Sequence, residues 1–191
     1  MPPLFLIDII ALGVSLVVAT SLALVTLGSD WRRTINRLFA LFTLLEAAWA
    51  MCSLLLRLAL WFEVGKPLLM SELTTFAFTL MGPVLLVFSV RYVNRRTRAA
   101  DLVAILGLIV MGLLAIPLFS HQLVFNPRLD TNGSTTMELG SLGFVLAPLP
   151  ALYFAWSLIL FWQERERIGE PYLPLSILTL VIGFVLGGVL N

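Results

Sequence analysis

Six long apolar runs constrain the fold of this chain more than any other feature. They cover about residues 4–27, 37–62, 69–93, 99–119, 142–162 and 172–190. The hydrocarbon core of a bilayer is about 30 Å thick and needs about 20 mostly apolar residues per helix. Backbone polar groups in lipid must be satisfied internally, so each run is predicted to be an α-helix. With 60% hydrophobic and 12% charged residues, residues 1–191 are predicted to form one all-α domain, a polytopic integral membrane bundle of six transmembrane helices.

The basic residues are divided unequally among the connections between these runs. The second and fourth connections carry only Lys66 and Arg128. The first, third and fifth carry Arg32, Arg33, Arg37, Arg91, Arg95, Arg96, Arg98, Arg165 and Arg167. Because basic loops stay on the cytoplasmic side, we predict an N-terminus outside, in the inner (cytoplasmic) membrane of a bacterium. The last run stops at Asn191 without a polar flank, which favours a seventh crossing beyond it or a short relative of such a protein.

Composition also excludes several classes of function. A net charge of +1 gives no electrostatic basis for a nucleic-acid partner, and the single cysteine, Cys52, cannot form an intrachain disulfide or a cysteine metal site. No nucleophile with its base, phosphate-binding glycine loop or catalytic carboxylate pair is recognisable, so we expect no enzyme. No metal or cofactor is predicted, although bound lipid or pigment is left open. The expected partners are the lipid bilayer and other membrane subunits or a second copy of the chain.

Three charged residues share one depth near the outer surface. Asp8 begins the first run, Arg57 comes late in the second, and Glu72 comes early in the third. If these helices are neighbours, Arg57 can bridge the two carboxylates, and the cluster can close an outward-facing cup or bind a polar ligand. The structural alternative is interfacial snorkelling with an ion pair that only supports the fold.

The same outer side carries the only histidine and a pair of prolines. His121 follows the fourth run, and Pro148 and Pro150 stand in the outer half of the fifth, where a kinked or open helix is expected. Irregular backbone at membrane depth is tolerated against protein or a water-filled cavity, so we assign all three residues to the tentative ligand site. Their structural alternatives are a polar interfacial histidine and a bend that improves packing.

Glu46 is an acidic residue well inside the membrane. It stands eight residues, or about 12 Å, inside the cytoplasmic end of the second helix, where intramembrane ionisable groups often mark a proton path, a ligand site or a subunit contact. The structural alternative is a protonated Glu46 that is hydrogen-bonded to a hydroxyl such as that of Thr20.

Small residues indicate where helices approach closely. A four-residue spacing on the first run and a GxxxG pattern on the last are typical of tight helix contacts in membranes. The residues are Ala11, Ser15, Ala19, Ala23, Gly183 and Gly187. In the long outer connection, Asn132-Gly133 predicts a turn.

Several segments, read in order, resemble the N-terminal seven-transmembrane sensory region of some bacterial histidine kinases and related signalling proteins. They are NRLFALFTLLEAAWA, GPVLLVFSVRYVNRR, SHQLVF and LPALYFAW. The resemblance covers the first six helices and implies a sensor that passes a displacement to a cytoplasmic output domain. Glu46 and Arg57 depart from that pattern. The six apolar runs also supply neither the seventh helix nor the output domain that the pattern implies.

Two functions therefore follow. The first is a sensor-like transmembrane module for a ligand or a membrane state. The alternative is an accessory or structural subunit of a larger respiratory, photosynthetic or transport complex. A proton channel that uses Glu46 is the third and weakest hypothesis, because one acidic residue without repeat symmetry is little evidence.

Overall fold

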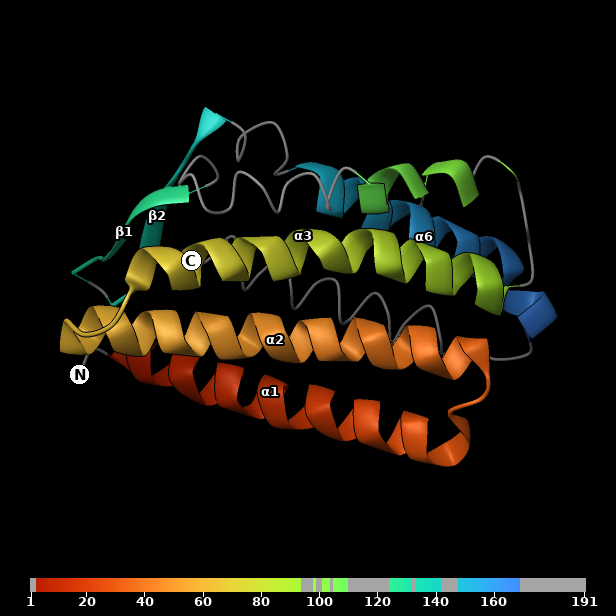
Figure 1. The fold of residues 1–191 in the computed structure, drawn as a ribbon, viewed down its shortest axis with the longest axis horizontal. Helices are drawn as coiled ribbons and strands as arrows, with labels where there is room; N and C mark the ends of the chain where they lie inside the picture. Colours follow the sequence, from red (N-terminus) through yellow and green to blue (C-terminus); the bar gives the residue numbers. More distant parts are fainter. Residues whose placement is uncertain are drawn as a thin grey trace.

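The computed structural model describes residues 3–93, 98, 101–103, 105–109, 124–131, 133–141 and 148–168 of the chain. Its elements are α1 (Pro3–Asp30), α2 (Thr34–Phe62), α3 (Pro67–Tyr92), β1 (Val124–Leu129), β2 (Thr135–Leu139) and α6 (Pro148–Ile168). Figure 1 shows α1, α2 and α3 side by side and alternating in direction, with α6 next to α3. The chain is mostly helical, as predicted.

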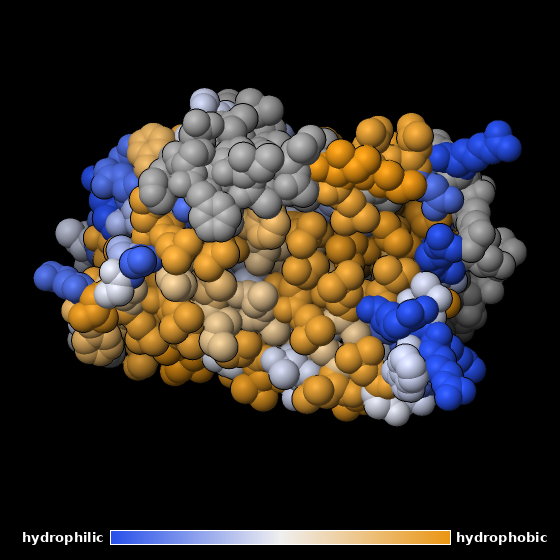
Figure 2. All heavy atoms as spheres, viewed as in Figure 1, coloured by the Kyte–Doolittle hydropathy of each residue, from blue (hydrophilic) through white to orange (hydrophobic). Residues whose placement is uncertain are grey.

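Three of the described helices, α1, α2 and α3, are long and apolar enough to cross a membrane. They coincide with the first three predicted runs. Figure 2 shows apolar side chains over the middle of the face in view and hydrophilic side chains at its two ends, the distribution expected of a bundle with a lipid-facing band. Lipid is therefore the natural solvent for the exposed side chains of α1.

Local sequence explains why α2 ends and α3 begins where they do. Glu63 takes the left-handed conformation at φ 55°, and its neighbour Val64 donates its N–H to the Ala59 carbonyl oxygen at 3.0 Å. This pattern satisfies carbonyl groups at the end of a helix. Gly65 follows with φ 81°, a value that suits glycine, and Pro67 opens α3, where its missing N–H has no cost.

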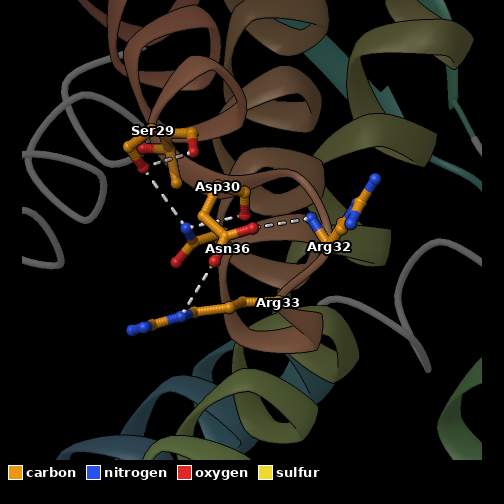
Figure 3. Close-up of polar contacts among 6 residues, drawn as sticks. Ser29, Asp30, Arg32, Arg33 and Asn36 are labelled. Carbon is orange, nitrogen blue, oxygen red and sulfur yellow. Dashed lines mark hydrogen bonds and ion pairs between the residues drawn. The ribbon is translucent and has the colours of Figure 1, made fainter.

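A polar network fixes the turn between α1 and α2 (Figure 3). The Asn36 side-chain amide donates to the Asp30 carbonyl oxygen at 2.9 Å and to Ser29 Oγ at 3.3 Å. The Asp30 carboxylate accepts the Arg32 backbone N–H at 3.1 Å and pairs with Arg33 Nε at 3.0 Å. The start of α2 is thus tied to the end of α1.

The apolar core lies between α2, α3 and α6. Its buried members are Phe42, Met81, Val84, Leu85, Phe88, Val93, Phe154 and Phe161. Phe88 is central, with its ring centroid 5.4 Å from that of Phe39 on α2 and 6.2 Å from that of Phe161 on α6. Because α3 contacts both neighbours, it is the most buried of the helices that can cross a membrane.

A close approach joins the middle of α3 to the start of α6. A methyl group on Gly82 would lie 3.0 Å from Tyr153 Cβ and 3.3 Å from Pro150 Cα, so the contact requires a residue without a side chain. Pro148 and Pro150 lie in the first turn of α6, where a proline lacks an N–H that would have had no helical partner. In the described residues, these prolines open the helix and do not bend it from within.

The end of α6 differs from the prediction. The fifth run was expected over residues 142–162, but α6 continues to Ile168 through the polar residues after Trp162. Helical residues at 101–103 and 105–109 coincide with the beginning of the fourth run. The rest of that run, the sixth run, His121, Gly183 and Gly187 lie outside the described residues.

A β-hairpin in the connection before α6 departs from the all-helical expectation. β1 and β2 pair antiparallel with an irregularity between Phe125 and Arg128. The turn is closed by a hydrogen bond of 2.8 Å from the Asp130 N–H to the Ser134 carbonyl oxygen, and Gly133 has φ 86°, so Gly133 of the predicted pair lies in the turn. Val124 is fully buried and packs the hairpin onto α3, against Leu73, Phe76 and Leu80.

Candidate functional site

A charged cluster occupies one end of the bundle. Asp8 is five residues from the start of α1, Arg57 is five residues from the end of α2, and Glu72 is five residues from the start of α3. Because these helix ends lie together (Figure 1), the three residues share one depth, about 7.5 Å inside the helix ends.

An ion pair joins the first two helices. Arg57 Nε and Nη2 donate to Asp8 Oδ2 at 3.2 and 3.1 Å, and Arg57 Nη1 donates to the Ser53 carbonyl oxygen at 3.4 Å. The Arg57 side chain is only 5% exposed, whereas that of Asp8 is 30% exposed. A guanidinium removed from water in this way needs its carboxylate, because an unpaired buried charge is strongly destabilising.

Glu72 adds a second carboxylate on α3. It is completely buried, as is its neighbour Ser71. Two threonines follow on the same helix, and the Thr74 and Thr75 hydroxyls donate to the Met70 and Ser71 carbonyl oxygens at 2.8 and 2.9 Å. The first third of α3 is therefore a largely buried segment with several polar residues, which is uncommon in a helix that can cross a membrane.

Aromatic rings cover the ion pair. Phe5 stands three residues before Asp8, and Trp61 stands four residues after Arg57, so both rings lie nearer the helix ends than the charges do. Their centroids are 4.6 Å apart, and Phe5 is fully buried. This pair lies between the charged cluster and the ends of α1 and α2.

The proline pair flanks Leu149, which packs with Leu73 against Val124 of the hairpin. Pro150 lies beside Gly82, which is ten residues, or about 15 Å, farther along α3 than Glu72. The hairpin does contact both α2 and α3 near the cluster. The structure thus brings together Asp8, Arg57 and the start of α3, and it places Pro150 beside Gly82.

Glu46 lies deeper on the same face of α2 as Arg57. Ser53 and Arg57 follow it by seven and eleven residues, which are two and three helical turns, so Glu46 is about 16 Å from the ion pair along the axis. Its side chain is half-buried. The Thr20 hydroxyl donates to the Leu16 carbonyl oxygen of its own helix at 2.7 Å and is not a donor for Glu46.

The small residues spaced four apart on α1 are not all buried. Ala19 and Ala23 are buried, Ser15 is half-buried and Ala11 is exposed. The buried side of α1 is made by Phe5, Leu12, Ala19 and Ala23, and α1 packs mainly against α2. The four-residue spacing alone missed this side because the large residues Phe5 and Leu12 share it.

No group of three or more histidine, cysteine, aspartate or glutamate side chains is placed to hold a metal ion in the described ranges. The arrangement has one evident chemical capacity, which is to hold opposite charges in a poorly solvated place between helices. Comparison of the chain with models of protein families, with curated proteins and with solved structures finds no match.

Proposed function

We propose that this chain is a non-enzymatic, sensor-like transmembrane module, in which the outer charged cluster responds to a polar ligand or to the state of the membrane. The observation that carries the proposal is the Asp8–Arg57 pair, a contact of 3.1 Å between helices α1 and α2. The resemblance to sensory regions of bacterial signalling proteins agrees with it.

The pair can act as a switch because few side chains in the first half of α1 are buried. Between Phe5 and Ala19, α1 buries only Leu12, and many of its large apolar side chains are exposed. A charged compound that competes for Asp8 or Arg57 would remove the main polar link between the helices. A change in bilayer thickness would alter the depth of the pair, and helices respond to such mismatch by tilting.

The topology that we propose has six crossings, with the N-terminus outside in a cytoplasmic membrane. The end of α1, the start of α2 and the ends of α3 and α6 lie at one end of the bundle (Figure 1). Arg32, Arg33 and Arg37 belong to that end, whereas Lys66 and Arg128 belong to the other. The excess of arginine supports a cytoplasmic location for the former.

Pairs of spin labels on a Cys52→Ser chain test the proposal. Leu4→Cys with Val64→Cys reports on the outer ends of α1 and α2, and both positions are exposed. We expect this distance to change by about 3 Å or more, two residues of helix rise, between nanodiscs of short-chain and long-chain phosphatidylcholine.

The inner ends provide the matched control. Gly28→Cys with Leu41→Cys should give the same distance in both bilayers, because the Asn36 and Asp30 contacts tie these ends together. Asp8→Asn should lengthen or broaden the outer distance in both bilayers. Outer distances that are unaffected by both the bilayer and Asp8→Asn would contradict a sensor that works through this pair.

A specific observation favours the alternative function, an accessory subunit of a larger membrane complex. Leu6, Ile10, Val14, Val17 and Leu24 expose apolar surface along most of α1, and another subunit can cover such a surface. Purification from the native membrane in mild detergent, with intact-mass analysis, separates the two functions. Fixed partners at constant stoichiometry would support the subunit, whereas a mass above that of these 191 residues would favour the sensor.

A further inference from the structure

We propose that the turn between α1 and α2 binds the headgroups of anionic phospholipids. Three arginines, Arg32, Arg33 and Arg37, are exposed there within six residues. They stand between two helices that are able to cross a membrane, so their guanidinium groups lie where lipid phosphates lie. This inference rests on membrane insertion of α1 and α2 and does not depend on the sensor function.

The neighbours of these arginines suit a lipid better than a soluble anion. Trp31 is 64% exposed and holds the Arg32 guanidinium 6.0 Å from its ring centroid. Exposed tryptophan at a helix end is typical of the headgroup level of a bilayer. Leu24 and Val25, one to two turns earlier on α1, are also exposed, so acyl chains can lie along the same helix below the charges.

The turn keeps its positive charge available. The Asp30 carboxylate offsets the charge of one arginine, because its oxygen lies 3.0 Å from Arg33 Nε. The Arg33 side chain nevertheless remains 76% exposed. The first turn of α2 contains no acidic residue. The turn is also held in place by the Asn36 amide, so little conformational entropy is lost when a headgroup binds.

More than one lipid is expected at this turn. Figure 3 shows the Arg32 and Arg33 side chains leaving the turn in different directions, with Asp30 between them. Guanidinium groups bind phosphate oxygens in a planar, two-point geometry. A membrane-surface arginine strengthens binding to anionic lipid by about 1 kcal/mol, or roughly five-fold.

Native mass spectrometry of the full chain in mild detergent tests this site, with phosphatidylglycerol and phosphatidylcholine as the probes. We expect the unaltered protein to retain phosphatidylglycerol preferentially. The double variant Arg32→Gln/Arg37→Gln leaves the Arg33–Asp30 pair intact and should lower the preference by roughly ten-fold or more. The variant Arg32→Lys/Arg37→Lys should retain most of it, because charge is the main term.

The control removes two positive charges from the other end of the bundle. Lys66→Gln/Arg128→Gln should leave the preference within about two-fold of the original, since electrostatic attraction falls off within a Debye length of about 10 Å. Equal losses in both double variants, or none in Arg32→Gln/Arg37→Gln, would overturn the proposal. Displacement of phosphatidylglycerol by an excess of inorganic phosphate would identify a site for free anions and would equally overturn it. Far-UV circular dichroism checks that each variant is folded.

Discussion

Arg57 and Asp8 are 49 residues apart in the sequence, yet two donors of the arginine meet one oxygen of the aspartate. Asp8→Asn keeps the shape of the side chain but removes the negative charge that lies 3.1 Å from the buried guanidinium. We expect it to destabilise the folded protein by about 2–4 kcal/mol, somewhat below the range for a fully buried pair, because Asp8 is partly exposed. Thermal unfolding in detergent, followed by circular dichroism at 222 nm, measures the change.

A double-mutant cycle isolates the pair from other effects of substitution. Arg57→Met removes the buried charge while keeping a long side chain, and Asp8→Asn should cost much less in that background than alone. Additive effects of the two substitutions would show that the contact between them contributes nothing to stability.

The close contact at Gly82 gives a second prediction. A methyl group there meets Tyr153 Cβ at 3.0 Å and the backbone at Pro150 Cα at 3.3 Å, so Gly82→Ala should force α3 and α6 apart and cost about 1–3 kcal/mol. Gly13 is the matched control, because a methyl group added there meets nothing within 4 Å. Gly13→Ala should leave the unfolding temperature unchanged or raise it, since glycine weakens a helix interior. Equal effects of the two substitutions would contradict the close approach.

The first three helices were predictable because hydropathy alone determines a membrane span. No end of α1, α2 or α3 differs from the predicted run by more than three residues. The helices extend beyond the apolar runs at Ser29 and Thr34, where the Ser29 hydroxyl accepts from the Asn36 amide across the turn and the Thr34 hydroxyl accepts from Arg37 Nη2 within α2. Comparing depths along the runs also placed Asp8, Arg57 and Glu72 at one level.

Hydropathy did not predict which sides of the helices pack together, and it did not predict the β-hairpin. The buried side of α1 depends on where α2 lies, and a four-residue spacing cannot distinguish Ala19, which is buried, from Ala11, which is exposed. The strands of the hairpin are short and mix apolar with polar residues, so their pairing gives no clear hydropathy signal, and the sequence indicates only the turn at Gly133. The sequence shows the depth of Pro150 along its run but not its neighbour Gly82.

Thr135 gives a third prediction, on the hairpin. It is buried, and its hydroxyl oxygen has no hydrogen-bond partner among the residues that the structure describes. Such a group costs about 1–3 kcal/mol in desolvation, so the isosteric change Thr135→Val should stabilise the protein by about 1 kcal/mol.

Thr136→Val is the matched control for Thr135→Val. The Thr136 hydroxyl donates to the Arg128 carbonyl oxygen at 3.3 Å across the hairpin. The Thr136→Val protein should therefore unfold at the same temperature as the unaltered protein or slightly below it. A Thr135→Val protein that unfolds at a lower temperature than the Thr136→Val protein would show that the Thr135 hydroxyl is satisfied after all.

Gly107 and Tyr153 give a fourth prediction, because the ring of Tyr153 fills the space that the Cβ of any larger residue at position 107 would occupy. A methyl group on Gly107 would collide with Tyr153 Oη and lie 2.8 Å from Cζ, and it would lie 3.1 Å from Pro83 Cγ. The Tyr153 hydroxyl also donates to the Val103 carbonyl oxygen at 3.3 Å. Gly107→Ala should therefore be destabilising by about 1–3 kcal/mol, through overlap and through loss of this hydrogen bond.

Removal of the hydroxyl separates these two causes. Tyr153→Phe alone should cost only about 0.5–1.5 kcal/mol, the net value of one hydrogen bond. In the Tyr153→Phe background, Gly107→Ala should cost less than it does alone, because the most severe collision is with the missing oxygen. Removal of the hydroxyl should reduce the cost of Gly107→Ala only in part, since the contacts with Tyr153 Cζ and Pro83 Cγ remain. Unfolding temperatures of the four proteins give the coupling energy, and a value near zero would place Gly107 away from the Tyr153 hydroxyl.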